Sequence, residues 1–173
     1  KPITMAAALD AGAVTPATTY NDKGSLTLDS KTISNFDGKA RGVVPMQEVL
    51  SQSLNVGIGF IVQKMGTGTL RDYFQRFGIT EETGIDLPGE VHGLVENLGG
   101  KQAVEFSTAS FGQGIAVTPI EMTRALAVLA NGGKLVTPHL ARAIKEESGI
   151  TRELGWGEPT QVLKQETVTA VTR

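Results

Sequence analysis

The sequence has no cysteine, a single tryptophan and no run of the roughly 20 apolar residues that a membrane span needs. The lack of cysteine excludes disulfides, zinc–thiolate sites and a cysteine nucleophile, and it is equally compatible with a location inside or outside the cell. No charged-then-apolar signal opens the chain either. We therefore expect any membrane anchor or export signal to lie outside these 173 residues.

The sequence also lacks an excess of basic charge, since its formal net charge is −2 and its pI is about 5.7. Nucleic acid is not an expected partner, because phosphate binding needs a basic surface. The only two histidines, His92 and His139, are far apart and have no second ligand at a suitable spacing, so we expect no metal site and no cofactor. With 40% apolar and 20% charged residues, the chain has the composition of one globular domain or most of one.

Helical signals dominate the sequence. Gly12, Gly66 and Gly78 are natural helix ends, Thr67 is a candidate N-cap, and Thr118-Pro-Ile-Glu121 forms a capping box with proline in the first turn. The second predicted helix is interrupted by Asn55-Val-Gly57 and then resumes. The helices predicted in this way cover residues 1–11, 45–54, 58–65, 67–77, 119–130 and 166–173.

Strand signals are shorter and concentrate in two places. Between Val14 and Gly42 the only plausible strands are Leu26–Leu28 and Thr32–Ile33, and beyond the last strong helix the candidates are 135–136, 140–144 and 161–163. Residues 79–101 read as loop, and 106–115 as a glycine-rich stretch of small residues. The turn formers of the 14–42 segment are Asn21, Asp22, Gly24, Asn35, Asp37 and Gly38. We expect an α+β fold that is helix-rich, with its sheet incomplete in this chain.

Two polar features stand out against this background. Lys1 begins a helix and is followed by proline, and 52 positions later Ser53-Leu-Asn55 stands at a break between helices. Serine and asparagine disfavour helix interiors, so this triplet is unusual there. On spacing alone, Lys1 reads as a solvated first residue, and Ser53 and Asn55 read as caps of the helix that follows.

Longer phrases carry more information than these short triplets. The chain resembles the class B penicillin-binding proteins, the monofunctional transpeptidases of cell-wall synthesis, over essentially its whole length. The phrases that carry the resemblance, in the order that the family shows, are Lys1-Pro-Ile-Thr, Leu50-Ser-Gln-Ser-Leu-Asn-Val-Gly57, Thr83-Gly-Ile-Asp-Leu-Pro-Gly-Glu90 and Ser110-Phe-Gly-Gln-Gly-Ile-Ala-Val-Thr-Pro-Ile120.

The resemblance implies the penicillin-binding protein and serine β-lactamase-like fold, with three catalytic motifs: Ser-x-x-Lys, Ser-x-Asn and Lys-Thr-Gly. Lys1 matches the lysine of the first motif, whose amine acts as a base when its pKa is depressed. Ser53 and Asn55 match the second motif. In that role Ser53 relays a proton and Asn55 holds the amide of the substrate with its own amide.

The resemblance also sets the expected domain boundaries. Residues 1–173 are expected to be a partial transpeptidase domain that starts at the lysine of Ser-x-x-Lys and ends before Lys-Thr-Gly. The phrase Lys64-Met-Gly-Thr-Gly-Thr69 is not Lys-Thr-Gly, and it falls at a predicted helix end instead of on a strand. The chain alone is therefore expected to be inactive, unless a second chain supplies the missing motifs.

For the whole protein, the resemblance implies peptidoglycan stem peptides as substrates and β-lactam antibiotics as inhibitors that acylate the serine. It also implies a location at the extracytoplasmic face of the bacterial membrane. Two alternatives share the fold: a β-lactam sensor or non-catalytic scaffold, and a serine β-lactamase. The loop-rich segment from Val14 to Gly42 and the phrase from Gly84 to Glu90 favour the transpeptidase.

Overall fold

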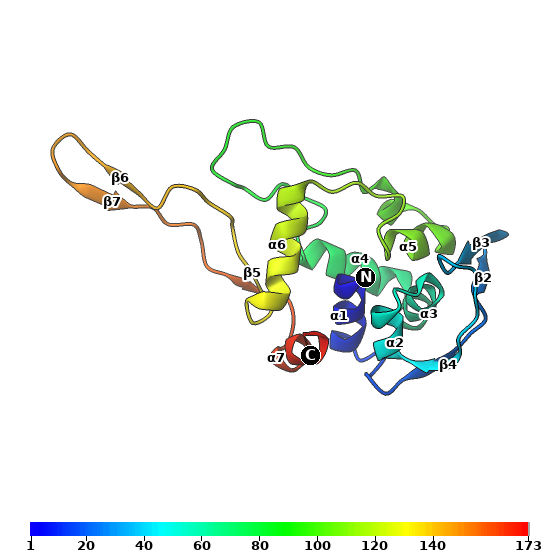
Figure 1. The fold of residues 1–173 in the computed structure, drawn as a ribbon. Coiled ribbons are helices and arrows are strands. Elements are labelled where there is room, and N and C mark those ends of the chain that lie inside the picture. The colour runs from blue at the N-terminus through cyan, green and yellow to red at the C-terminus, as the bar shows by residue number, and fades with distance from the viewer. Residues whose placement is uncertain (173) are drawn as a thin grey trace.

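The computed structural model describes residues 1–172, which form a helical body with short strand pairs at its edges (Figure 1). Pro2 opens the first helix and three consecutive alanines fill its interior, in agreement with their helix preferences. The helices are α1 (Pro2–Asp10), α2 (Met46–Ser51), α3 (Asn55–Met65), α4 (Thr67–Arg76), the short 3₁₀ helix η1 (Glu96–Gly99), α5 (Ala103–Ala109), α6 (Pro119–Ala130) and α7 (Gln165–Val171).

Helix α3 lies at the centre of the body, where it packs against α1, α2, α4 and α5. Except for the partly buried Phe60, its apolar side chains are almost wholly inaccessible, as are the alanines of α1 and the aromatic residues of α4. Each buried aliphatic or aromatic side chain of this kind stabilises a fold by about 1.5–3 kcal/mol. The core therefore fixes the relative positions of α1 and α3, the helices that carry the candidate site.

All strands of the described chain occur in separate antiparallel pairs: β1 with β4, β2 with β3, β5 with β8, and β6 with β7. Within residues 1–172 no pair joins another to make a wider sheet. The strands are β1 (Thr19–Asp22), β2 (Ser25–Leu28), β3 (Lys31–Ser34), β4 (Gly42–Pro45), β5 (Lys134–Leu135), β6 (Ala143–Lys145), β7 (Thr151–Glu153) and β8 (Thr160–Gln161). This mixture of helices and strand pairs confirms the expected α+β class.

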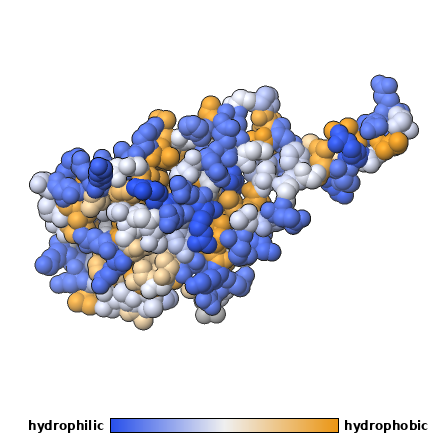
Figure 2. All heavy atoms as spheres, turned by 180° about the vertical axis from the view of Figure 1, so that it is seen from behind, coloured by the Kyte–Doolittle hydropathy of each residue, from blue (hydrophilic) through white to orange (hydrophobic). Residues whose placement is uncertain are grey.

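The β6–β7 hairpin extends away from the helical body as an arm, seen at the left in Figure 1 and from behind in Figure 2. Its surroundings include exposed apolar side chains at Leu140, Ile144 and Ile150. Among the described residues, no helix combines the length and the apolar character needed to cross a membrane.

The structure corrects several boundaries. The break before α3 falls at residues 52–54, so Asn55-Val-Gly57 is the first turn of α3 and not an interruption. Thr67 is the first residue of α4, and Gly66, with a φ of 85°, takes the N-cap position. Strands β1, β4 and β7 and helix α5 were not predicted.

Candidate active site

Lys1 and Ser53, which are 52 positions apart in the chain, are in direct contact. The Lys1 ammonium group lies just before α1 and donates hydrogen bonds to the Ser53 hydroxyl oxygen at 2.7 Å and to the Ser53 carbonyl oxygen at 2.6 Å. The packing of α1 against α3 brings the two residues together. Lys1 directly precedes α1, and Ser53 lies two residues before the start of α3. Two of the three residues singled out in the sequence are therefore brought together.

The backbone of Ser53 adopts a conformation that is uncommon for serine. Its φ is +55°, in the left-handed region, and the residue is exposed between α2 and α3. Left-handed backbone at a non-glycine residue costs of the order of 1 kcal/mol and clusters at functional sites. The tight turn is held by the Ser53 amide, which donates to the Leu50 carbonyl at 3.1 Å, and by the Leu54 amide, which donates to the Val49 carbonyl at 2.9 Å.

Asn55 is partly buried and lies in the first turn of α3, but its carboxamide is not bonded to Lys1 or Ser53. Its Nδ2 donates to the Ser34 carbonyl at the end of β3, at 3.0 Å. Helix α3 has Leu54 at its N-cap and no side-chain capping bond. The capping role that spacing alone favours for Ser53 and Asn55 is therefore absent from this structure.

The environment of Lys1 makes its side chain easier to deprotonate than a fully solvated lysine. Partial burial lowers the pKa of the Lys1 side chain below its usual 10.5, because a desolvated ammonium is disfavoured. Its nitrogen lies 6.0 Å from the centre of the Phe111 ring. The buried Thr4 hydroxyl donates to the Ser110 carbonyl at 2.6 Å, which fixes this part of the chain against α1.

A buried polar pair behind the Ser-x-Asn turn was read in the sequence only as turn formers. Asp22 is 1% exposed and Asn35 is 4% exposed. The Asn35 Nδ2 donates to the Asp22 carboxylate at 2.8 Å, and its Oδ1 accepts from the Val56 amide at 3.2 Å. Their burial marks Asp22 and Asn35 as part of the support of this turn. Nothing in the neighbouring sequence indicates that they are buried.

Gly57 explains why the phrase continues with a glycine. A Cβ at this position would lie 2.6 Å from a Val49 methyl group and 2.8 Å from the Tyr20 hydroxyl. The φ of Gly57 is not positive, so the requirement is for close packing of α3 against α2 and β1.

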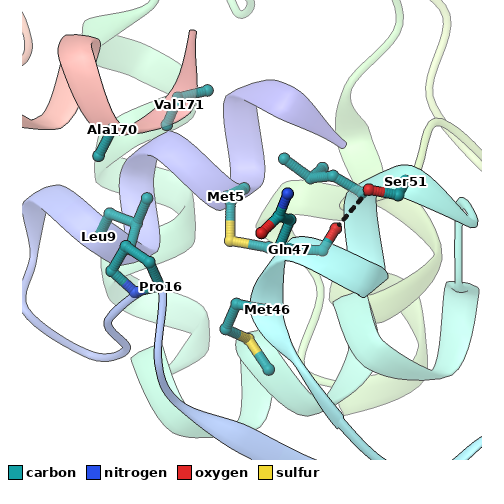
Figure 3. A pocket seen from close by; sticks show the side chains of 9 residues that line it. Met5, Leu9, Pro16, Met46, Gln47, Ser51, Ala170 and Val171 are labelled. Carbon is teal, nitrogen blue, oxygen red and sulfur yellow. Dashed lines mark hydrogen bonds between the residues drawn. The ribbon is translucent and has the colours of Figure 1, made fainter. Parts of the chain in front are cut away.

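A pocket of about 460 Å³ opens elsewhere, between α1, α2 and α7 (Figure 3). The side chains that line it are mostly apolar, and Ser51 at its edge donates to the Gln47 carbonyl at 3.0 Å. None of the three candidate residues lines it. Across residues 1–172, no three histidine, aspartate or glutamate side chains gather as a metal site would require.

The fold of the chain is similar to that of solved structures of other proteins. Penicillin binding protein 3 from Mycobacterium tuberculosis, solved in complex with aztreonam, superposes with a TM-score of 0.90 at 27% identity, over 98% of this chain and 38% of that one. A structure described as a putative peptidoglycan glycosyltransferase, from Atopobium parvulum, gives a TM-score of 0.85 at 30% identity, over 98% of this chain and 39% of that one. The fold class is thus that of the penicillin-binding protein transpeptidase domains.

Sequence comparison gives the family. The chain matches the penicillin binding protein transpeptidase domain over residues 1–173, and it belongs to that family. Stage V sporulation protein D of Bacillus subtilis is 33% identical over 96% of this chain, and the peptidoglycan D,D-transpeptidase MrdA of Acinetobacter baumannii is 30% identical over 83%. These regions amount to 26% and 23% of the two relatives, so the chain spans about a quarter of their length. The resemblance drawn from the four sequence phrases is confirmed.

Proposed function

We propose that this chain forms the central part of the catalytic domain of a peptidoglycan cross-linking D,D-transpeptidase. In this proposal the domain starts upstream with a serine three residues before Lys1 and ends downstream with a Lys-Thr-Gly motif. The observation that carries it is the pair of hydrogen bonds between the Lys1 ammonium and Ser53. Membership of the family and the names of the relatives support the reaction class.

The reaction would be an acyl transfer. The upstream serine hydroxyl attacks the carbonyl carbon between the two D-alanines of a stem peptide, an oxygen–carbon bond forms, and the carbon–nitrogen bond breaks. Neutral Lys1 accepts the serine proton, and Ser53, at 2.7 Å, relays a proton to the departing amine. An amine of a neighbouring strand then takes the acyl group and frees the serine.

Asn55 would hold the amide of the substrate. Its side chain offers both a donor and an acceptor, and its donor is bonded to the Ser34 carbonyl in this structure. A β-lactam would enter the same site, acylate the serine and keep its leaving nitrogen tethered. The solved complexes of Mycobacterium tuberculosis penicillin binding protein 3 with aztreonam and ampicillin support this assignment. The domain would work at the extracytoplasmic face of the membrane, where its substrate lies.

Replacing Ser53 tests the proposal in the full-length protein. Ser53→Ala removes the hydroxyl that contacts Lys1, and it should slow acylation by a fluorescent penicillin at least about tenfold, the lower range for a positioned proton-transfer group. The rate is measured by stopped labelling and gel fluorescence. Ser51→Ala is the matched control, because Ser51 is exposed two residues earlier and bonds only to the Gln47 carbonyl. Equal rates for wild type and Ser53→Ala would refute the relay role.

A further inference from the structure

One short stretch of chain outside the Ser-x-Asn turn contacts it: Ser34, the last residue of β3, and Asn35, which follows it. The Ser34 carbonyl accepts from the Asn55 carboxamide at 3.0 Å, and Asn35 Oδ1 accepts from the Val56 amide at 3.2 Å. Ser34 and Asn35 thus form hydrogen bonds with Asn55 and Val56, which lie in the first turn of α3. The segment is distant in sequence and belongs to none of the family phrases described above.

The second of these bonds replaces a missing helix cap. The first amide groups of a helix have no partner within it, and a side chain usually supplies one. Leu54 stands at the N-cap of α3 and has no side-chain oxygen to offer. Asn35, directly after β3, therefore supplies the acceptor that the local sequence lacks, and its partner Val56 is the residue next to Asn55.

Asp22 determines which way the Asn35 carboxamide points. One carboxylate oxygen of Asp22 accepts from the Gly24 amide at 3.0 Å, and the other accepts from Asn35 Nδ2 at 2.8 Å. The same Nδ2 also donates to the Lys39 carbonyl at 3.2 Å. With Nδ2 committed to these acceptors, Oδ1 must face the Val56 amide. Both side chains are almost fully buried, so an error in this pairing would leave polar groups without partners.

We infer that Asn35, oriented by Asp22, is a positioning residue for the Ser-x-Asn motif. It sets where Asn55 places its carboxamide and where the strained Ser53 backbone presents its hydroxyl to Lys1. The inference rests on the proposed function, because the reaction that it tunes is the acylation proposed above. Displacements of about 1 Å in such groups can cost a large factor in rate.

Reversing the polarity of the pair is the sharpest test. Asn35→Asp keeps an acceptor for Val56 but sets two carboxylates against each other, and it should slow acylation of the full-length protein by about tenfold or more. Adding Asp22→Asn restores a donor to the pair: Asn at 22 accepts from Gly24 and donates to Asp at 35, which still accepts from Val56. The double variant should regain part of the rate, because a carboxylate oxygen at 35 would still face the Lys39 carbonyl to which Asn35 now donates.

The measurement separates the noncovalent dissociation constant of a fluorescent penicillin from the first-order acylation rate, at a temperature where circular dichroism shows every variant folded. Asp10→Asn is the control for lost stability, since Asp10 is also buried but lies at the far end of α1 from Lys1. It should leave both constants unchanged.

The outcomes distinguish a positioning role of Asn35 from a purely structural one. A slow single variant rescued by the double variant supports the inference. Wild-type rates for Asn35→Asp alongside a slow Ser53→Ala overturn the inference alone, and so does a double variant that regains its melting temperature but not its rate. A slowing shared by Asp10→Asn would make Asn35 merely structural. Wild-type rates for Ser53→Ala and Asn35→Asp together would overturn the proposed relay role of Ser53 as well.

Discussion

Lys1 owes its candidate role to what surrounds its amine, because a solvated lysine would be protonated and could not accept a proton. Two oxygens of Ser53 lie within hydrogen-bonding distance, and partial burial lowers its pKa. No carboxylate forms an ion pair with it among the described residues, so the neutral form is not opposed by a nearby negative charge. Burial therefore lowers the pKa of Lys1, whereas the two hydrogen bonds hold its amine beside the Ser53 hydroxyl.

This gives a prediction for the pH dependence of acylation in the full-length protein. Because the pKa of Lys1 is lowered from 10.5, the acylation rate should rise with pH, and its ascending limb should be centred below that value. Lys1→Arg should abolish this limb, because the guanidinium stays protonated throughout. Acylation rates of a fluorescent penicillin between about pH 6 and 10 provide the measurement. A limb that persists in Lys1→Arg would assign the titration to another group.

The three candidate site residues were predicted from the sequence, but the buried residues that support the Ser-x-Asn turn were not. Lys1, Ser53 and Asn55 came from short motifs read in the context of family phrases. Asp22 and Asn35 look like ordinary turn formers, because aspartate and asparagine are common in turns for local reasons. Only their burial and mutual hydrogen bond show that they act across the fold.

At the level of elements, strong local signals predicted the structure well. The capping box of α6 is present as expected, with the Thr118 hydroxyl accepting from the Glu121 amide and the Glu121 carboxylate accepting from the Thr118 amide. Strands β1 and β4 escaped prediction, because Thr19–Asp22 and Gly42–Pro45 hold turn residues and only become strands by pairing with each other. Helix α5 consists mostly of small residues whose periodicity is weak, and it is stabilised by packing against α3 and α4.

Glu121 caps its own helix and also binds the backbone of the loop that contains Gly93. It is fully buried, and its carboxylate accepts from the Gly93 amide at 2.9 Å as well as from Thr118. Glu121→Ala leaves both amides without an acceptor and should destabilise the protein by about 2–4 kcal/mol. Glu121→Gln keeps one acceptor and should cost less.

Urea unfolding of the full-length protein measures both changes. Glu147→Ala is the matched control, since Glu147 is exposed beyond β6 and should change the free energy of unfolding by no more than about 0.5 kcal/mol. Equal stability of Glu121→Ala and Glu147→Ala would show that the Gly93 and Thr118 amides find other partners.

At the scale of the molecule, the described chain is a helical body without a continuous sheet. Its strand pairs lie at different edges, and α7 returns to lie beside α1 (Figure 1). The local sequence predicted both α1 and α7 as helices, but it could not predict that they pack against each other. Asp10, the last residue of α1, connects the two helices. It accepts hydrogen bonds from Tyr73 and Lys164, which lie about 60 and 150 positions further along the chain.

Asp10 should make the assembly of α1, α4 and α7 sensitive to acid. Its carboxylate accepts hydrogen bonds from the Tyr73 hydroxyl at 2.7 Å, the Lys164 amide at 2.7 Å and the Thr167 hydroxyl at 2.8 Å. Burial alone would raise the pKa of Asp10, but these hydrogen bonds and the Lys164 charge lower it below 3.8. A carboxyl group with a depressed pKa stabilises the fold above its unfolded-state pKa, and this stability is lost as the pH falls through the folded-state pKa.

Asp10→Asn places an amide group against three donors, so the variant should be less stable than wild type at pH 7. The gap between the two should narrow from about pH 5 downward, because wild type loses the contribution of the ionised carboxylate and the variant has none to lose. Urea unfolding of the full-length protein at a series of pH values measures the gap, and Asp72→Asn, at an exposed position on α4, is the control. A gap that stays constant from pH 7 to pH 3 would show that the ionised state of Asp10 does not hold the three helices together.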